Sequence, residues 1–287
     1  MRYVRTIAAV AALAIAGMGA AQAQTAAPVT AATPLAIGQT FTLESKALGE
    51  TRRINVYLPS VYADLATGRL PVLYMPDGGL GEDFLHVAGL VQVLTGNGTM
   101  RPFILVGIEN TQRRRDLTGP TTSAEDRKIA PKVGGSAAYR RFIREELMPQ
   151  VRQRYRTTSE TAIVGESLAG LFVVETLLLE PKLFDTYLAF DPSLWWNNGQ
   201  LAAQAGTLLR AAGRPSVAVY LATSSQGELK ATRQLQEAAE PEATRSGTWG
   251  YEWHYELMPE ETHATIYHPA ALRAFRAVFK PQARHKD

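Results

Sequence analysis

One serine stands in a context that could turn its hydroxyl into a nucleophile. Ser167 lies in the segment GESLA, between the apolar residues 162–164 and the long apolar run 170–179. A buried strand, a tight turn and a helix in that order would project the hydroxyl from the turn, the layout called a nucleophile elbow. Such a turn strains the backbone and requires small residues two positions before and after the serine, here Gly165 and Ala169. Alanine in place of the usual second glycine is a mild departure.

A serine hydroxyl needs a base to take its proton and an acid to orient that base. His263 is the histidine best placed to be the base, because it follows the last predicted strand in the polar sequence EETHAT. It also completes the chain order nucleophile, acid, histidine that accompanies such an elbow. The other candidates fit less well: His86 precedes the serine on a predicted helix, His254 lies inside a strand pattern, and His268 directly precedes a proline.

Two residues compete for the position of the acid. Glu228 follows the predicted strand 217–221 through the turn Ser-Ser-Gln-Gly, which is the expected position of the third member. Asp191 follows the preceding strand and is the alternative. Glu260 and Glu261 are close to the histidine in sequence, but we expect them to be solvated. We therefore predict Glu228 as the acid, with Asp191 next.

Acyl transfer also needs backbone donors for the oxyanion. We expect Leu168 to supply one N–H, because it follows the nucleophile, and Gly79 to supply the other from an early strand-to-helix loop. Trp195 and Trp196 could wall an apolar or aromatic substrate pocket, and Arg113 could bind an anionic substrate. The alternatives are that the tryptophans pack in the core and that the arginine belongs to a solvated run of charge.

Strand and helix patterns alternate along the chain and place these side chains. Runs apolar on both faces are typical of a parallel sheet covered by helices, whereas residues 39–45 and 53–58 alternate like an antiparallel edge hairpin. The pattern predicts a doubly wound, mostly parallel α/β sheet with an antiparallel N-terminal edge, in which the site forms at the carboxyl ends of the strands. Further strands are expected at 70–76, 103–108, 162–164, 186–190, 216–222 and 251–258, and helices at 84–94, 137–155, 170–179, 201–212, 228–239 and 270–279.

The polar segment 111–136 is expected to be a loop. It is long for a compact domain and contains three consecutive arginines, two prolines and a glycine pair. Loops of this length are more often functional than idle.

Composition and the N-terminus indicate one exported catalytic domain. Residues 1–23 carry two arginines, the apolar run 7–16 and the small residues Ala21 and Ala23 before a cut, as in a secretory signal peptide. Residues 24–38 resemble a flexible leader, and 39–287 would form one α/β-hydrolase catalytic domain. We therefore expect a periplasmic or secreted protein with no membrane span after the signal is removed.

Charge and cysteine content exclude several classes of function. The chain has 287 residues and a formal net charge of +3, and loss of the two N-terminal arginines leaves 28 basic and 27 acidic residues. This balance does not indicate a nucleic-acid partner. Cysteine is absent, which excludes disulfides and thiol chemistry. The histidine spacings do not indicate a metal site.

Five segments together resemble a known family: PVLYMPDGG, GIENTQRRRDLTGPT, GESLAGLFVVETLL, FDPSLWWNN and EETHATIYHPA. They are similar to the bacterial esterase D-like "putative esterase" family of α/β-hydrolases, near the ferri-siderophore esterases such as the ferri-bacillibactin and salmochelin esterases. The likeness covers roughly residues 40–280. It implies hydrolysis of carboxylic esters without a cofactor, with Ser167 as nucleophile and His263 as base. Some members of the family work with a Ser–His pair and no well-placed acid.

The sequence thus predicts an exported serine esterase that works through an acyl-enzyme on a small-molecule ester. By the resemblance, a siderophore-type ester bearing catechols would suit Trp195, Trp196 and Arg113. Two alternatives remain at this stage. One is an acyltransferase on the same fold, and the other is a non-catalytic ligand-binding protein on a hydrolase scaffold.

Overall fold

The computed structural model describes residues 32–211, 216–244 and 251–281, and its compact unit is Ala36–Asp287. The predicted signal peptide 1–23 and most of the predicted leader lie outside the described residues, so both stay predictions. None of the described helices is long and apolar enough to span a bilayer.

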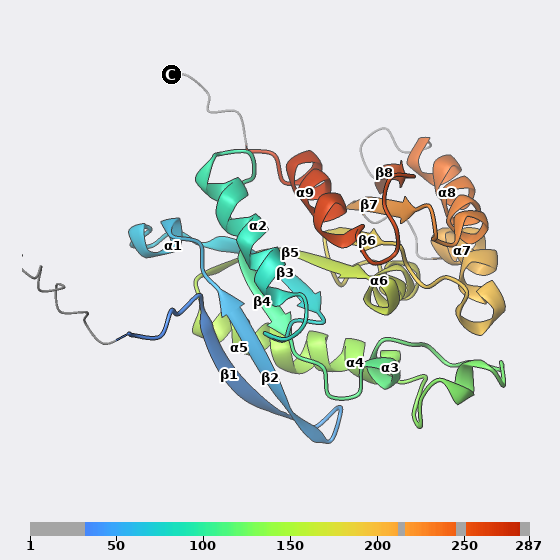
Figure 1. Ribbon diagram of the computed structural model, residues 1–287, viewed down its shortest axis with the longest axis horizontal. Helices are drawn as coiled ribbons and strands as arrows, with labels where there is room; N and C mark the ends of the chain where they lie inside the picture. The colour runs from blue at the N-terminus through green and yellow to red at the C-terminus, as the bar shows by residue number, and fades with distance from the viewer. Residues whose placement is uncertain (1–31, 212–215, 245–250, 282–287) are drawn as a thin grey trace, which may run out of the picture. The chain divides into compact units, whose positions relative to one another are not determined.

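A single eight-stranded sheet forms the centre of this unit (Figure 1). Its strand order is β1-β2-β4-β3-β5-β6-β7-β8, in which β5 and β6 are direct neighbours. The strands are β1 (Gln39–Ser45), β2 (Glu50–Tyr57), β3 (Leu70–Pro76), β4 (Ile104–Ile108), β5 (Thr157–Glu166), β6 (Thr186–Phe190), β7 (Val217–Ser224) and β8 (Tyr251–Met258).

The predicted antiparallel edge is confirmed. β1 and β2 pair in register from Gln39 opposite Val56 to Ser45 opposite Glu50, and β2 also runs antiparallel to β4. The turn between β1 and β2 uses Gly49 at a φ of 66°, a backbone conformation that favours glycine. The remaining neighbours in the sheet are parallel. Their carboxyl ends therefore lie at one edge.

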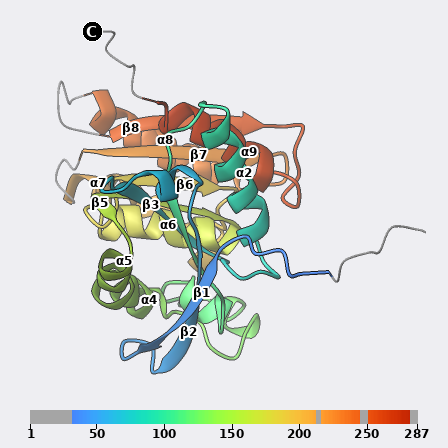
Figure 2. The same cartoon turned by 90° about the vertical axis from the view of Figure 1, so that its left-hand side faces the viewer.

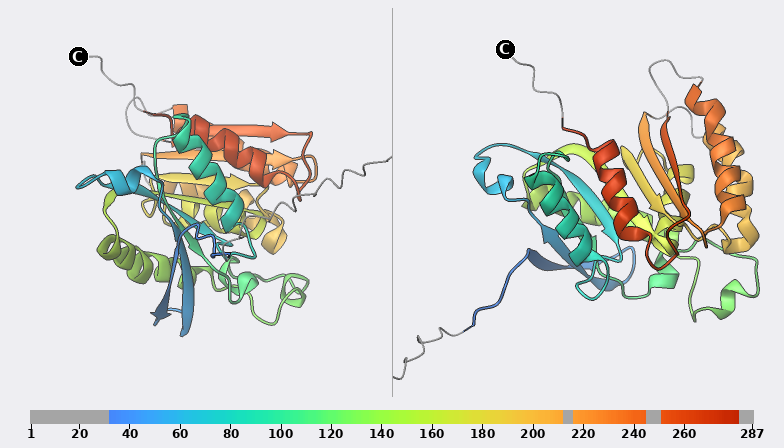
Figure 3. Two further views of the ribbon diagram at one scale, coloured as in Figure 1. Left: turned by 60° about the vertical axis from the view of Figure 1, so that its left-hand side comes forward. Right: turned by 45° about the horizontal axis from the view of Figure 1, so that its top comes forward.

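Helices cover both faces of the sheet (Figures 2 and 3). On one face α2 and α9 pack together over a core that includes Phe84, Phe103 and Phe275. The other face carries α4 to α8 over a larger core. The α-helices are α1 (Val61–Asp64), α2 (Phe84–Gly96), α3 (Arg113–Asp116), α4 (Ser136–Phe142), α5 (Met148–Arg154), α6 (Ser167–Leu179), α7 (Gln200–Ala211), α8 (Leu229–Thr244) and α9 (Tyr267–Val278). The α/β architecture expected from the sequence is confirmed.

The single helix predicted over residues 137–155 is interrupted. A π-helical segment, η2 (Ile143–Leu147), separates α4 from α5. Pro149 lies in the first turn of α5 and has no backbone N–H to give to the carbonyl four residues before it. Within the π segment, the Glu146 carboxylate accepts hydrogen bonds from Ser45 Oγ at 2.6 Å and Ala47 N at 2.9 Å. Through Glu146, the π-helical segment is hydrogen-bonded to the turn between β1 and β2.

A buried arginine connects the sheet to the long loop 111–136. The Arg52 side chain on β2 is fully buried and donates to Asp116 Oδ2 at 2.5 Å and to the Glu109 carbonyl at 2.8 Å. Glu50 accepts from Arg115 at 2.8 Å, and this hydrogen bond lowers the pKa of Glu50 to about 2. A buried charge is tolerated only when it is paired and hydrogen-bonded. The network therefore fixes the start of the loop at the sheet edge.

Replacing Arg52 by methionine should destabilise the fold, because Asp116 and the Glu109 carbonyl would lose a buried donor. We expect Arg52→Met to lower the free energy of unfolding by about 3 kcal/mol, measured by urea denaturation. Arg53→Met is the matched control, since the side chain of Arg53 is 53% exposed. The control should change stability by less than about 0.5 kcal/mol. Equal effects of the two variants would contradict this role for Arg52.

Candidate active site

Ser167 occupies the turn that its sequence predicts. β5 ends at Glu166, α6 begins at Ser167, and the serine has a φ of 59°, a strained value for a residue with a side chain. A Cβ added at Gly165 would lie 2.7 Å from the methyl carbon of Ala169. Alanine is thus accommodated here because its partner across the turn is glycine. The Ser193 N–H donates to the Ser167 carbonyl at 3.0 Å and helps to hold the turn.

Three side chains form a continuous hydrogen-bonded chain at the carboxyl edge of the sheet. The Ser167 hydroxyl lies 3.0 Å from His263 Nε2. On the other side of the ring, His263 Nδ1 lies 2.8 Å from Asp191 Oδ2. With a proton on Nδ1, the ring donates to the carboxylate and keeps Nε2 free to accept from the serine. The three side chains have the hydrogen-bonding geometry that a nucleophile, its base and an orienting acid require.

Asp191 is built into the site as a buried anion. It follows β6 at a φ of 44°, and its side chain is fully buried. Ser224 donates to it twice, from its N–H at 3.0 Å and from its hydroxyl at 2.7 Å. A Cβ added at Gly227 would lie only 1.9 Å from Asp191 Oδ1, so glycine is needed beside the carboxylate. Together with the imidazole, these donors satisfy a charge that burial would otherwise penalise.

The structure brings Asp191, and not the predicted Glu228, to the ring of His263. Glu228 is exposed just before α8, and its backbone carbonyl accepts a hydrogen bond from the Thr232 N–H. The physical reason is the strand order, because β6 lies directly beside β5, whereas β7 lies one strand further from the serine. Asp191, the alternative, therefore meets His263 and Glu228 does not. Glu260 and Glu261 also stay away from the ring, hydrogen-bonding Arg273 and Thr265.

The two predicted oxyanion donors differ in the structure. Leu168 is the second residue of α6, and N–H groups in the first turn of a helix have no partner within it. The Gly79 N–H, in contrast, donates to Glu82 Oε2 at 2.6 Å. Glu82 also accepts from Asn110 Nδ2 at 3.0 Å, which holds it against the loop after β4. In this arrangement the Leu168 N–H can donate a hydrogen bond to an oxyanion, whereas the Gly79 N–H already donates to Glu82.

A second carboxyl beside the base was missed by the sequence interpretation. Glu166 occupies the variable position between Gly165 and the nucleophile, and its Oε1 lies 3.3 Å from His263 Nε2. Its side chain is 15% exposed, and burial raises the pKa of Glu166 to about 8, with Arg113 opposing the rise. The carboxyl is therefore mostly protonated at pH 7. Its position next to Ser167 was the only available signal.

Arg113 is part of the site but is not a free cation. Its guanidinium forms two hydrogen bonds to Asp77, Nε to Oδ1 and NH2 to Oδ2, each at 2.7 Å. Asp77 follows β3 at a φ of 57° and is almost fully buried. The arginine side chain is 36% exposed. It can still present its outer edge to a ligand while the bidentate pair fixes its direction.

The two tryptophans take different positions. Trp196 is buried, and its indole N–H donates to the Gly119 carbonyl at 2.9 Å, so it packs against the loop 111–136. Trp195 is 41% exposed. Of the predicted pair, only Trp195 is therefore available to contact a substrate.

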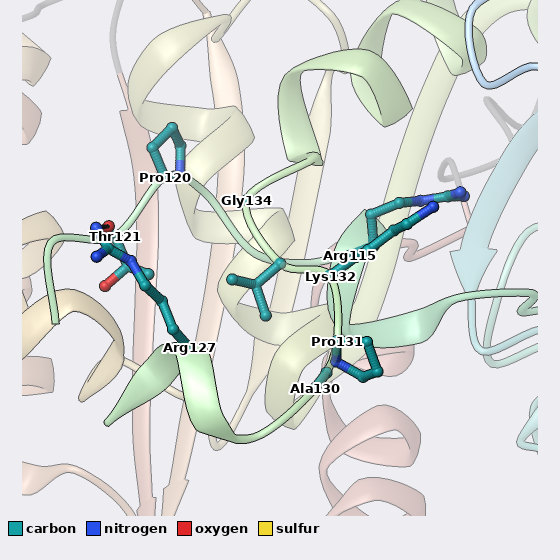
Figure 4. A pocket seen from close by; sticks show the side chains of 9 residues that line it. Arg115, Pro120, Thr121, Arg127, Ala130, Pro131, Lys132 and Gly134 are labelled. Carbon is teal, nitrogen blue, oxygen red and sulfur yellow. Dashed lines mark hydrogen bonds between the residues drawn. The ribbon is translucent and has the colours of Figure 1, made fainter. Parts of the chain in front are cut away.

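Residues of the loop 111–136 also line an open hollow of about 680 Å³ (Figure 4). Pro120 and Thr121 lie on one side of it, and Arg115, Pro131 and Lys132 on the other. The residues that line it do not include Ser167, His263 or Asp191, so the hollow is separate from the hydrogen-bonded chain. Among the described residues, no group of three or more histidine and acidic side chains could hold a metal ion.

The eight-stranded sheet, the elbow and the order Ser167, Asp191, His263 define an α/β-hydrolase fold. A family model described as "Putative esterase" matches residues 45–280, and the chain belongs to this family. An IroE-like serine hydrolase from Shewanella oneidensis superposes with a TM-score of 0.73 and 29% identity, over 84% of this chain and 80% of that one. The BES protein from Bacillus cereus, 22% identical, shares the fold with a TM-score of 0.72, over 87% of this chain and 98% of that one.

Curated relatives match little more than half of the chain. The ferri-bacillibactin esterase BesA of Bacillus subtilis is 30% identical over 165 residues, which are 52% of this chain and 56% of that protein. The siderophore triacetylfusarinine C esterase of Aspergillus fumigatus is 32% identical over 177 residues, 58% of this chain and 59% of that protein. The chain thus spans little more than half the length of these relatives.

Replacing Asp191 and Glu228, one at a time, by the corresponding amide should show which of the two carboxylates orients His263. Asp191→Asn would disturb the tautomer and orientation of His263, so we expect kcat for a p-nitrophenyl ester to fall by about 10⁴. Glu228→Gln, an exposed change, should leave kcat within about twofold. Steady-state kinetics on the two purified variants checks this. A large loss in Glu228→Gln with little loss in Asp191→Asn would reverse the assignment.

Proposed function

We propose that this protein is an exported serine esterase that hydrolyses carboxylic esters through an acyl-enzyme. The observation that carries the proposal is the chain Asp191–His263–Ser167, with links of 2.8 and 3.0 Å. A buried, hydrogen-bonded acid, an imidazole and a strained serine in this order are the parts that acyl transfer needs. Membership of an esterase family supports the same class of reaction.

In the acylation step, Ser167 Oγ attacks the acyl carbon while its proton passes to His263 Nε2. Asp191 stabilises the imidazolium formed, because its carboxylate faces Nδ1. The Leu168 N–H donates to the oxyanion of the tetrahedral intermediate. When the intermediate collapses, the bond to the alcohol oxygen breaks, and the proton on Nε2 goes to that oxygen.

Deacylation repeats the same proton path with water. His263 takes a proton from water, the resulting hydroxide attacks the acyl carbon, and the carboxylic acid leaves as Ser167 recovers its proton from Nε2. The His263 side chain is 46% exposed, so water has direct access to the base. This exposure favours hydrolysis over transfer of the acyl group to another alcohol.

The substrate we propose is a siderophore-type ester. Relatives carry the names ferri-bacillibactin esterase and siderophore triacetylfusarinine C esterase. On this chain, the exposed Trp195 offers an aromatic face, and the oriented Arg113 offers a cation for an anionic or phenolic group. The signal peptide expected at residues 1–23 would place the enzyme outside the cytoplasm, in the periplasm or secreted, where it could meet such a ligand.

Ser167→Ala should abolish ester turnover with little change in thermal unfolding, because it removes one hydroxyl at the edge of the core. A fluorophosphonate probe followed by peptide mass spectrometry should label Ser167 in the wild type. Ser193→Ala is the matched control, since that hydroxyl lies 3.4 Å from the nucleophile and should be dispensable for labelling.

Retained turnover in Ser167→Ala would contradict the proposal. Absence of labelling, combined with stabilisation of the folded protein by a ferric siderophore and no product, would favour a binding protein instead. Ester products formed with added alcohols would identify an acyltransferase.

A further inference from the structure

The mechanism above leaves one carboxyl in the site unused. Glu166 Oε1 lies 3.3 Å from His263 Nε2, the same nitrogen that faces the Ser167 hydroxyl at 3.0 Å. This oxygen is buried and has no hydrogen-bond partner among the described residues. An unpaired polar atom in a buried position requires an explanation. Here it points to a partner that arrives with the substrate.

The groups around Glu166 keep its proton in place. Acids on three other segments act on its charge, namely Asp77 after β3, Asp83 before α2 and Asp191 after β6. Arg113 on α3 is the cation facing it, and this guanidinium is already paired with Asp77. Tyr267 on α9 is also buried, and its hydroxyl has no hydrogen-bond partner in the described part of the chain. Burial raises the pKa of Tyr267 well above its usual value, and the charge of Glu166 adds to this rise. Burial and these acids together raise the pKa of Glu166 to about 8.

The position of the leaving alcohol follows from the role of the base. An oxygen that receives the proton of His263 Nε2 must come within hydrogen-bonding distance of that nitrogen. Glu166 Oε1 is 3.3 Å from the same nitrogen, so an oxygen that approaches this nitrogen on the side facing Glu166 also comes within hydrogen-bonding distance of the carboxyl. Resting on the proposed esterase activity, we propose that neutral Glu166 donates a hydrogen bond to the alcohol oxygen of the ester as that oxygen leaves the acyl carbon.

No proton leaves Glu166 in this step. The bond between the acyl carbon and the alcohol oxygen breaks, the electron pair goes to the oxygen, and the proton on His263 Nε2 moves to it. The Glu166 O–H stabilises the negative charge that develops on this oxygen, as donors do in an oxyanion hole. Ionised Glu166 would act in the opposite way, because it would repel the alkoxide and hold the proton on Nε2 in an ion pair.

The first test compares esters that differ in their need for help at the leaving oxygen. Ethyl butyrate and p-nitrophenyl butyrate share an acyl group, but only ethoxide needs strong stabilisation as it leaves. Glu166→Leu should lower kcat/KM for ethyl butyrate on the order of 10²-fold and for the nitrophenyl ester by less than about threefold. An equal loss of kcat/KM for both esters in Glu166→Leu would overturn the proposal. It would also be overturned if the wild type hydrolysed the nitrophenyl ester but not ethyl butyrate.

The second test is a pH profile with the isosteric amide. In the wild type, kcat/KM for ethyl butyrate should fall above about pH 8 as Glu166 ionises. Glu166→Gln keeps an N–H donor and cannot ionise, so its profile should stay flat where that of the wild type falls. Asp83→Asn removes a neighbouring negative charge, which lowers the pKa of Glu166 and should move the fall to lower pH. A profile of wild-type shape in Glu166→Gln would contradict this role.

Thermal unfolding gives a readout that does not depend on activity. Glu166 ionises near 4.5 in the unfolded chain and near 8 in the folded protein. The folded state therefore loses stability as pH rises between these values, and Glu166→Gln removes this loss. The difference in Tm between variant and wild type should grow by roughly 5 °C from pH 5 to pH 8, and a constant difference would contradict a neutral Glu166.

Fluorophosphonate labelling of each preparation separates the two proposals. If Ser167 is labelled but the Glu166 variants match the wild type in both kinetic tests, the proposed role of Glu166 is wrong, and the proposed esterase activity is unaffected. If the folded wild type is not labelled and turns over neither ester, the esterase itself fails, and the inference fails with it.

Discussion

The site depends on a single buried anion. Asp191 has no access to solvent, so its charge must be met by the Ser224 N–H and hydroxyl and by the imidazole of His263. These demands extend into the fold, because Gly227 must lack a side chain beside the carboxylate. β6 and β7 must also be paired so that their ends bring Asp191 and Ser224 together. The sheet thus positions the carboxylate that faces His263 Nδ1.

The elements and the reactive pair could be predicted because their signals are local. Apolar periodicity locates the strands and most of the helices, and the spacing around Ser167 needs only the sterics of one turn. The acid could not be settled in this way. Asp191 and Glu228 both follow parallel strands, and the choice between them depends on which strand lies next to β5, which is a tertiary fact. The close approach of Gly227 to the Asp191 carboxylate also favours Asp191, and it too could not be predicted from the sequence.

Charge in the site shows a similar limit. Nothing in the sequence singles out Glu166 or Asp77, because only folding brings Asp77, Asp83 and Asp191 close enough to affect the pKa of Glu166. Arg113 was chosen for its cation, yet the structure ties it to Asp77 in a bidentate pair. The Gly79 N–H is likewise taken by Glu82. Composition can suggest which groups belong to a site, but their partners determine what each can do.

The long loop is joined to the segment that begins with Asp191. The Trp196 indole donates to Gly119, and Asn197 bonds both Thr122 and Asp126. The loop is therefore a fixed wall rather than a lid, and a change in its length would be transmitted to the acid. Lys132, in contrast, is an exposed position of the loop. In evolution or in the laboratory, the charge of this rim can be altered to suit a new ligand, whereas the length of the loop has to change together with the catalytic core.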